Sequence, residues 1–199
     1  MGQAHRPTGT DPGAPTPADA PATRRNPLLR LGAPPVAAAA LTGTVALYMT
    51  LVAFGNITDF GTNQQFVQHV LSMDTTFKDP DLMWRAVESP ALQNAVYVAV
   101  IVWETLAALV LLAATWLWIT GLRRDAYDRA RAASTVGLVM VLLLFGAGFL
   151  AIGGEWFAMW QSSDWNGLDA AARNVALAAF TLLVVHLPGA RGRAAAEGT

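Results

Sequence analysis

Four long runs of apolar residues dominate the chain and predict four helices that cross a membrane. They cover residues 33–54, 93–119, 134–152 and 168–187. At about 1.5 Å per residue, each run is long enough for a hydrocarbon core about 30 Å thick. Gly153 and Gly154 are expected to end the third run, and Pro188 the fourth. The pattern therefore predicts an all-α membrane protein with its four transmembrane helices in a bundle.

The longest connection between these runs, residues 55–92, carries the pattern of two short helices. The segment 62–71 places its apolar residues on one helical face, and Asn63 is expected to cap its start. A second short helix is expected over 79–87, where an aspartate and a proline open the first turn. We expect both to lie at the membrane interface.

Composition supports the membrane assignment. The 199 residues are 54% hydrophobic and 14% charged, whereas about 25% charged is usual for a soluble domain. Residues 1–32 contain six prolines and few large apolar side chains, which predicts a disordered tail, and residues 188–199 form a second tail. A net charge of −1 argues against a nucleic-acid partner, and the absence of cysteine excludes thiolate chemistry.

Charged residues near the runs predict the orientation. Arginines cluster before the first run, between the second and third, and after the fourth, and such residues stay on the cytoplasmic side. Both tails and the second connection are therefore expected to be cytoplasmic, and the first and third connections to form outer loops. The clustered arginines are Arg24, Arg25, Arg30, Arg123, Arg124, Arg129, Arg131, Arg191 and Arg193.

Four motifs together resemble a bacterial family of predicted small integral membrane proteins, a four-helix domain of unknown function. They are residues 55–60, residues 66–77, the pair Trp103-Glu104 and residues 153–162. The resemblance extends from about Pro34 to Leu187 and implies a multi-pass protein of the bacterial plasma (inner) membrane. It implies no catalytic residue.

Glu104 is the sharpest candidate for a functional residue. It lies eleven residues after Gln93, or roughly 16 Å into the second span, where a carboxylate costs at least ~2.5 kcal/mol. Such a group is expected to face the bundle interior, with Thr44 and Tyr48 as candidate hydrogen-bond donors. Two interpretations remain open: a proton or cation site, and a hydrogen-bonded lock between helices.

Two pairs of charged or titratable residues are further candidates. Glu155 and Arg173 are placed where they could form an ion pair at the outer interface, although Asp169 competes for the arginine at helical spacing. His69 and Met73 are four residues apart, with Asp74 next to the methionine, and this set is too small for a metal site, so we expect no metal and no other cofactor.

Both outer loops contain candidate binding residues. Trp156 and Trp160 belong to a cluster of three tryptophans, typical either of an aromatic belt at the lipid headgroups or of a stacking and cation-binding surface. Asn56 and Asp59 belong to the motif in the first outer loop. Because the motifs fall in both outer loops, these loops are expected to pack into one cap.

These features favour a non-enzymatic membrane component whose cap binds a ligand or another membrane or periplasmic protein. A small transporter or proton-coupled carrier that uses Glu104 is the alternative. An enzyme acting on lipid or quinone ranks last, because no nucleophile, base and orienting group occur together.

Overall fold

The computed structural model describes residues 32–124 and 126–187, and this part of the chain contains four helices long and apolar enough to cross a membrane. The fold class predicted from the apolar runs is therefore confirmed. The two tails, apart from Gly32, lie outside the described residues. The elements are α2 (Pro34–Thr58), α3 (Phe60–Ser72), η2 (Met83–Arg85), α4 (Pro90–Arg124), α5 (Asp128–Leu142), η3 (Leu143–Trp156), η4 (Met159–Gln161) and α6 (Leu168–Val185).

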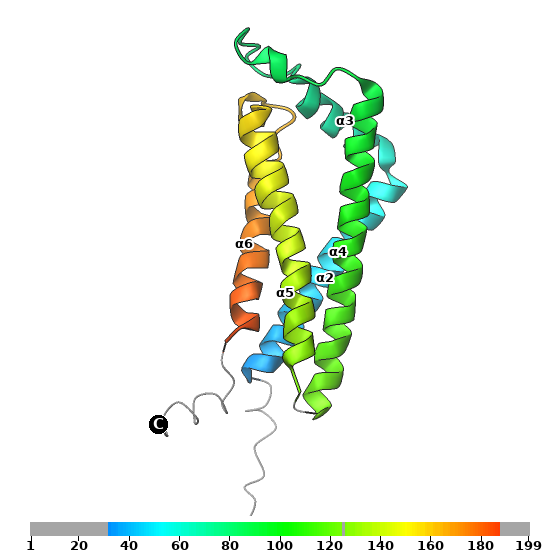
Figure 1. Cartoon of the computed structure of the whole chain (residues 1–199), viewed down its shortest axis with the longest axis vertical. Coiled ribbons are helices and arrows are strands. Elements are labelled where there is room, and N and C mark those ends of the chain that lie inside the picture. Colours follow the sequence, from blue (N-terminus) through cyan, green and yellow to red (C-terminus); the bar gives the residue numbers. More distant parts are fainter. Residues whose placement is uncertain (1–31, 125, 188–199) are drawn as a thin grey trace, which may run out of the picture.

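The long helices form an elongated antiparallel bundle (Figure 1). α4 packs against α2 and α5, and α6 packs against α2, α5 and η3. The start of α2, the end of α6 and the connection from α4 to α5 lie at one end of the bundle. Residues 59–89 and 156–167, which we call the cap, lie at the opposite end, or cap end. An even number of crossings thus places both ends of the described chain on one side.

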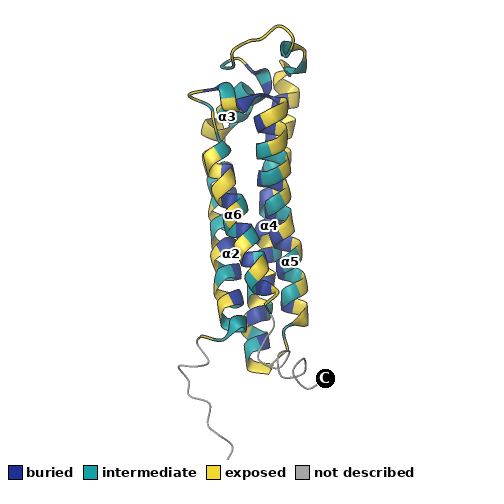
Figure 2. Cartoon of the chain, turned by 90° about the vertical axis from the view of Figure 1, so that its left-hand side faces the viewer, coloured by how far each residue is buried: buried dark blue, intermediate teal, exposed yellow. Residues whose placement is uncertain are grey.

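Each long helix carries both buried and exposed residues (Figure 2), and apolar side chains occur in both classes. Met49, Leu111 and Leu138 are fully buried between the helices, whereas Leu51, Leu109 and many similar residues are more than half exposed. Large exposed apolar surfaces are rare on soluble monomers. They match a hydrocarbon environment, so the burial pattern agrees with a bundle surrounded by lipid.

Away from the cap, the helices are held by a buried polar cluster and by close packing. The indole Nε1 of Trp118 donates a hydrogen bond to the Ser134 hydroxyl at 2.8 Å, and the Thr42 hydroxyl lies 3.3 Å from the same oxygen. All three side chains are fully buried. Gly137 on α5 faces Leu111 so closely that a Cβ there would lie 2.7 Å from the leucine side chain. These contacts bring α2, α4 and α5 together at this end.

Some predicted boundaries differ from the observed ones. The third membrane helix does not stop at Gly153-Gly154, because its hydrogen bonds change to π-helical spacing in η3 and continue to Trp156. Phe157 still donates its N–H to the Ile152 carbonyl at 3.0 Å, five residues back. The two glycines instead allow close packing, since a Cβ on Gly154 would lie 2.9 Å from the Leu168 side chain.

Of the two short helices predicted in the first connection, the structure contains the first and shortens the second. The first exists as α3, but it begins at Phe60, so Asn63 lies inside the helix and does not cap it. The second is reduced to the single 3-10 turn η2. The Asp79 side chain accepts a hydrogen bond from the Asp81 N–H, which makes a turn, and the Val87 N–H donates to Leu71 of α3. That bond draws the chain back to α3 before a longer helix forms.

Candidate functional site

The two connections at the cap end pack together, which confirms the expectation of a single cap. The Thr75 and Ser162 hydroxyls lie 2.8 Å apart, and the Phe77 N–H donates to the Gln161 side chain at 3.0 Å. Leu71 and Met73 pack with Phe157 and Ala158 in a small apolar core. Residues about 85 positions apart in the sequence thus form one layer over the bundle.

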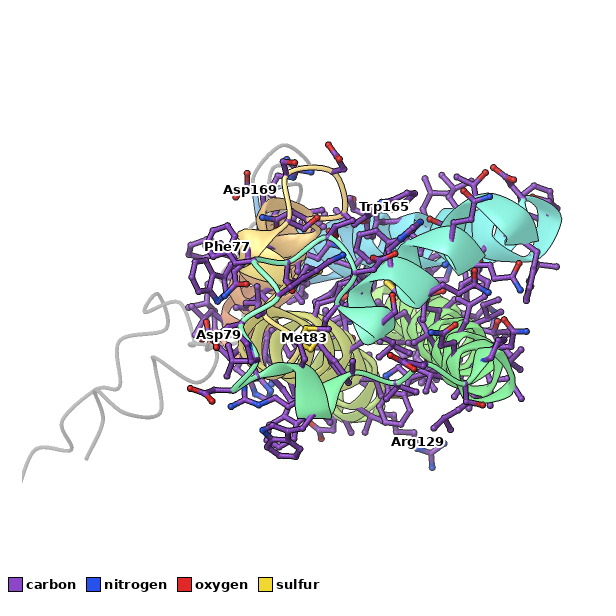
Figure 3. All side chains as sticks on the ribbon, turned by 90° about the horizontal axis from the view of Figure 1, so that it is seen from above. Phe77, Asp79, Met83, Arg129, Trp165 and Asp169 are labelled. Atoms are coloured by element: carbon purple, nitrogen blue, oxygen red, sulfur yellow. The ribbon has the colours of Figure 1, made fainter. Side chains whose placement is uncertain are left out.

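Exposed aromatic side chains of the two connections pair with one another in the cap. The Arg85 guanidinium lies 4.9 Å from the Trp156 ring centre and 5.6 Å from that of Trp84. Trp160 meets Phe77 edge to face, with ring centres 5.9 Å apart. Seen from above in Figure 3, Phe77, Asp79 and Met83 follow one side of the cap, and Trp165 lies near α3. Trp156 and Trp160 therefore each have a partner from the first connection, yet both remain about half exposed.

His69 joins the two connections on the side of α3. Its ring stacks on Trp165 with centres 4.4 Å apart, and Nδ1 lies 2.7 Å from an Asp74 oxygen. Met73, four residues after His69, turns away into the cap core and is almost fully buried. Within residues 32–124 and 126–187, no three histidine, aspartate or glutamate side chains gather where they could hold a metal ion.

A cavity of about 200 Å³ lies beneath the cap, between α3, α4, η3 and the start of α6. Its walls are mainly apolar and aromatic, and Glu104, Asn56 and Asn63 form its polar part. Pockets of this composition, with a few polar groups in an apolar wall, are typical of small-molecule sites. The remaining lining residues are Phe66, Val67, Tyr97, Val100, Phe145, Phe149, Gly167, Ala170 and Ala171.

Glu104 is 2% exposed, and its Oε2 accepts a hydrogen bond from the Asn56 amide at 2.6 Å. The interior orientation expected for this residue is therefore observed, but its partner is not one of the two predicted donors. Thr44 donates instead to the Ala40 carbonyl of its own helix. Asn56 lies two residues before the end of α2, which places Glu104 near the cap end and not at mid-bundle.

Lengths along α4 give the same level for Glu104. The residue follows Pro90 by 14 positions and precedes Arg124 by 20, or about 21 Å and 30 Å along the helix. Glu104 therefore lies nearer to the cap end of α4 than to its other end. The two predicted donors were wrong because α4 begins beyond the level at which α2 ends, so that the last turn of α2, which carries Asn56, lies beside Glu104.

A chain of side-chain amides leads from the surface to Glu104. Exposed Asn63 donates to the Asn56 side-chain oxygen at 2.7 Å, and Asn56 donates in turn to Glu104. The hydroxyl of buried Tyr97 donates to the backbone carbonyl of Asn56 at 3.2 Å and so fixes that residue further. Asn63 and Tyr97 were not predicted from the sequence. Only Tyr97 could have been found from the sequence, since it precedes Glu104 by seven residues, or two helical turns, and so lies on the same face of the helix.

A second cavity, also about 200 Å³, adjoins the first. Both are lined by Phe66, Val67, Val100 and Phe149, and the second extends between α3, α4 and η3. Its lining includes Val96, which is 37% exposed, and Ile152, which is 53% exposed. Because these residues are exposed, the second cavity reaches the apolar outer surface between α4 and η3.

The other predicted site residues lie away from the cavities. Glu155 and Arg173 are exposed, and His69–Asp74 is the one ion pair among the described residues, so the expected Glu155 bridge is not formed. Asp59 lies between α2 and α3 and accepts a hydrogen bond from the Thr62 hydroxyl at 2.9 Å. It stabilises the bend that carries α3 over the cavity.

The fold and the cavity together define a small, multi-pass helical membrane protein. Comparison with known families assigns it further: residues 35–188 match the family described as predicted small integral membrane protein (DUF2165), and the chain belongs to this family. No curated protein and no solved structure matches the chain. The family likeness noted in the sequence motifs is therefore confirmed.

Proposed function

We propose that this protein is a non-enzymatic membrane component that binds a hydrophobic small molecule beneath its cap. The observation that carries the proposal is a mainly apolar cavity in which one buried carboxylate, Glu104, faces the interior. An apolar wall with few polar groups favours binding and orientation of a ligand. Catalysis would require a nucleophile or an acid–base pair, and the lining has a single carboxyl group.

The surroundings of Glu104 favour binding over transport. A carrier needs a route from this residue to the far end of the bundle. That space holds Val45, Met49, Leu111 and Leu138, each at most 1% exposed, above the Trp118 cluster. Closely packed apolar side chains leave little room for water or ions. This packing makes the proton-coupled carrier the weaker candidate.

The proposal includes an orientation in the bacterial plasma membrane, with the cap outside and both tails in the cytoplasm. In support, Arg123, Arg124, Arg129 and Arg131 lie at the end opposite the cap. The cap itself contains only Lys78 and Arg85 as fixed cations. Positive charges near membrane spans are retained in the cytoplasm. The ligand would then reach the cavity from the outer leaflet or from the periplasm.

Filling the cavity tests the proposal. Val100 lines both cavities, whereas Val98 on the same helix is 48% exposed, so Val100→Phe and Val98→Phe make a matched pair. Each protein is reconstituted in lipid vesicles and labelled with a photoreactive alkyl diazirine, and the labelled peptides are identified by mass spectrometry. The expected result is labelling of the α3 and η3 walls in the unmodified protein and in Val98→Phe, and its loss in Val100→Phe. Equal labelling in all three proteins would refute a binding cavity.

A further inference from the structure

Among the residues that the structure describes, Glu104 has no positively charged partner. The one ion pair within residues 32–124 and 126–187 joins His69 and Asp74 in the cap, so neither lysine nor arginine reaches Glu104 there. The described part of the chain supplies one hydrogen bond to its carboxylate, from Asn56 to Oε2. The other oxygen, Oε1, accepts none from the described residues, although Glu104 is 98% buried and lines the first cavity. A buried charge is costly unless a cation or several donors compensate for it.

The hydrogen bonds around Glu104 are directed toward it. Asn63 donates to Asn56 and Asn56 donates to the carboxylate, so both amides present their N–H groups toward Glu104. Donors arranged in this way stabilise negative charge at the end of the chain. The rings of Phe66, Tyr97 and Phe149 line the same cavity, and aromatic faces attract cations. The arrangement suits a positive group placed beside Oε1.

We infer that the ligand is a cationic amphiphile, with an ammonium-type head at Glu104 and an apolar tail in the second cavity. The inference rests on the proposed binding function and adds the class of ligand. The second cavity adjoins the first and is lined by apolar residues as far as exposed Val96 and Ile152. A tail placed there reaches the lipid between α4 and η3, while the head displaces no protein hydrogen bond. An anionic head would instead meet a carboxylate of its own sign.

Three probes with the same alkyl chain test the ligand class: a primary amine, an alcohol and a carboxylic acid. Each competes with a photoreactive alkylamine for labelling of the protein in nanodiscs of zwitterionic lipid. The amine is expected to compete at a concentration at least about tenfold lower than the alcohol, since a hydrogen bond to a charged group contributes about 1.5–3 kcal/mol. The acid is expected to be the weakest competitor.

Two substitutions of the same kind provide the control. Glu104→Gln is expected to remove the advantage of the amine over the alcohol and to leave competition by the alcohol unchanged. Glu155→Gln, at an exposed carboxylate near the end of η3, is expected to leave the advantage intact. Continued competition by the alcohol shows that the Glu104→Gln protein is folded and retains its cavity.

The outcomes separate the inference from the proposed function. Equal competition by amine and alcohol in the unmodified protein, with all labelling lost in Val100→Phe, would overturn the cationic head and leave the binding cavity in place. An amine advantage that survives Glu104→Gln would also overturn the inference. Labelling that no probe reduces and that Val100→Phe does not change would overturn both.

Discussion

Substitution of Gly137 by alanine is expected to destabilise the bundle through one steric overlap. The new Cβ would lie 2.7 Å from both Cγ and Cδ2 of Leu111 and 3.3 Å from Val110. Carbon atoms pack best about 3.5–4.0 Å apart, so α4 and α5 must separate by most of an ångström or Leu111 must move. Leu111 is fully buried, which leaves it no free space. Overpacking of this kind costs about 1–3 kcal/mol.

Helix propensity partly offsets this cost, because alanine is favoured over glycine by about 0.8–1.0 kcal/mol within a helix. Gly55 in α2 supplies the control, since a Cβ there meets no atom within 4 Å. Gly55→Ala keeps the gain in propensity and avoids the overlap. The free energies of unfolding of the two variants are therefore expected to differ by about 1–3 kcal/mol, with Gly137→Ala the less stable.

The assay is reversible unfolding in mixed micelles of mild detergent and dodecyl sulfate, followed by tryptophan fluorescence. A second pair of proteins, Leu111→Ala with and without Gly137→Ala, lacks the two leucine atoms that would lie closest to the new methyl group. In the Leu111→Ala background, alanine at position 137 is expected to be neutral or stabilising. Equal stability of Gly137→Ala and Gly55→Ala, or the same cost of Gly137→Ala in both backgrounds, would refute the steric explanation.

Two further predictions concern the cap and the orientation, and the absence of native cysteine makes both measurable with introduced thiols. Thr75→Cys with Ser162→Cys is expected to form a disulfide, seen as a shift in gel mobility without reductant. Thr62→Cys with Ser162→Cys is the control and is expected to form none. No shift for the first pair would contradict the 2.8 Å contact between Thr75 and Ser162. Ser163→Cys is expected to react with an impermeant maleimide on intact cells, whereas Arg129→Cys is expected to react only after permeabilisation. The reverse pattern would contradict the proposed orientation.

The sequence predicts the four membrane helices well because the hydrocarbon core imposes a length and an apolar composition on each. The helix ends are less predictable. Residues 90–92 and 120–124 lie outside the predicted run 93–119, yet they belong to α4, which projects past the end of α2. The π-helical spacing of η3 is equally hidden, since Gly153-Gly154 has the pattern of a helix end. A change in hydrogen-bond register leaves no mark on hydropathy.

For the candidate site, the sequence identifies the charge but not its surroundings. Glu104 stands out as a carboxylate in an apolar run, and its burial follows from the cost of exposing it to lipid. Its hydrogen-bond partner could not be found by comparing depths along the predicted spans, because the apolar pattern places Asn56 in the first connection, outside every span. The cavities depend on how α3 crosses α4 and η3, and tertiary packing of this kind has no short-range pattern.

The polar cluster of Trp118, Ser134 and Thr42 and the glycine contact at Gly137 lie in the half of the bundle away from the cap. The cavities occupy the other half. This division separates the part of the molecule that maintains the fold from the part that determines what fits inside it. Substitutions at Val67, Val100 or Gly148 can therefore change the volume of the cavities while the distant half keeps the four helices in register. The size of the cavities can thus vary from one sequence to another without loss of the packing that stabilises the fold.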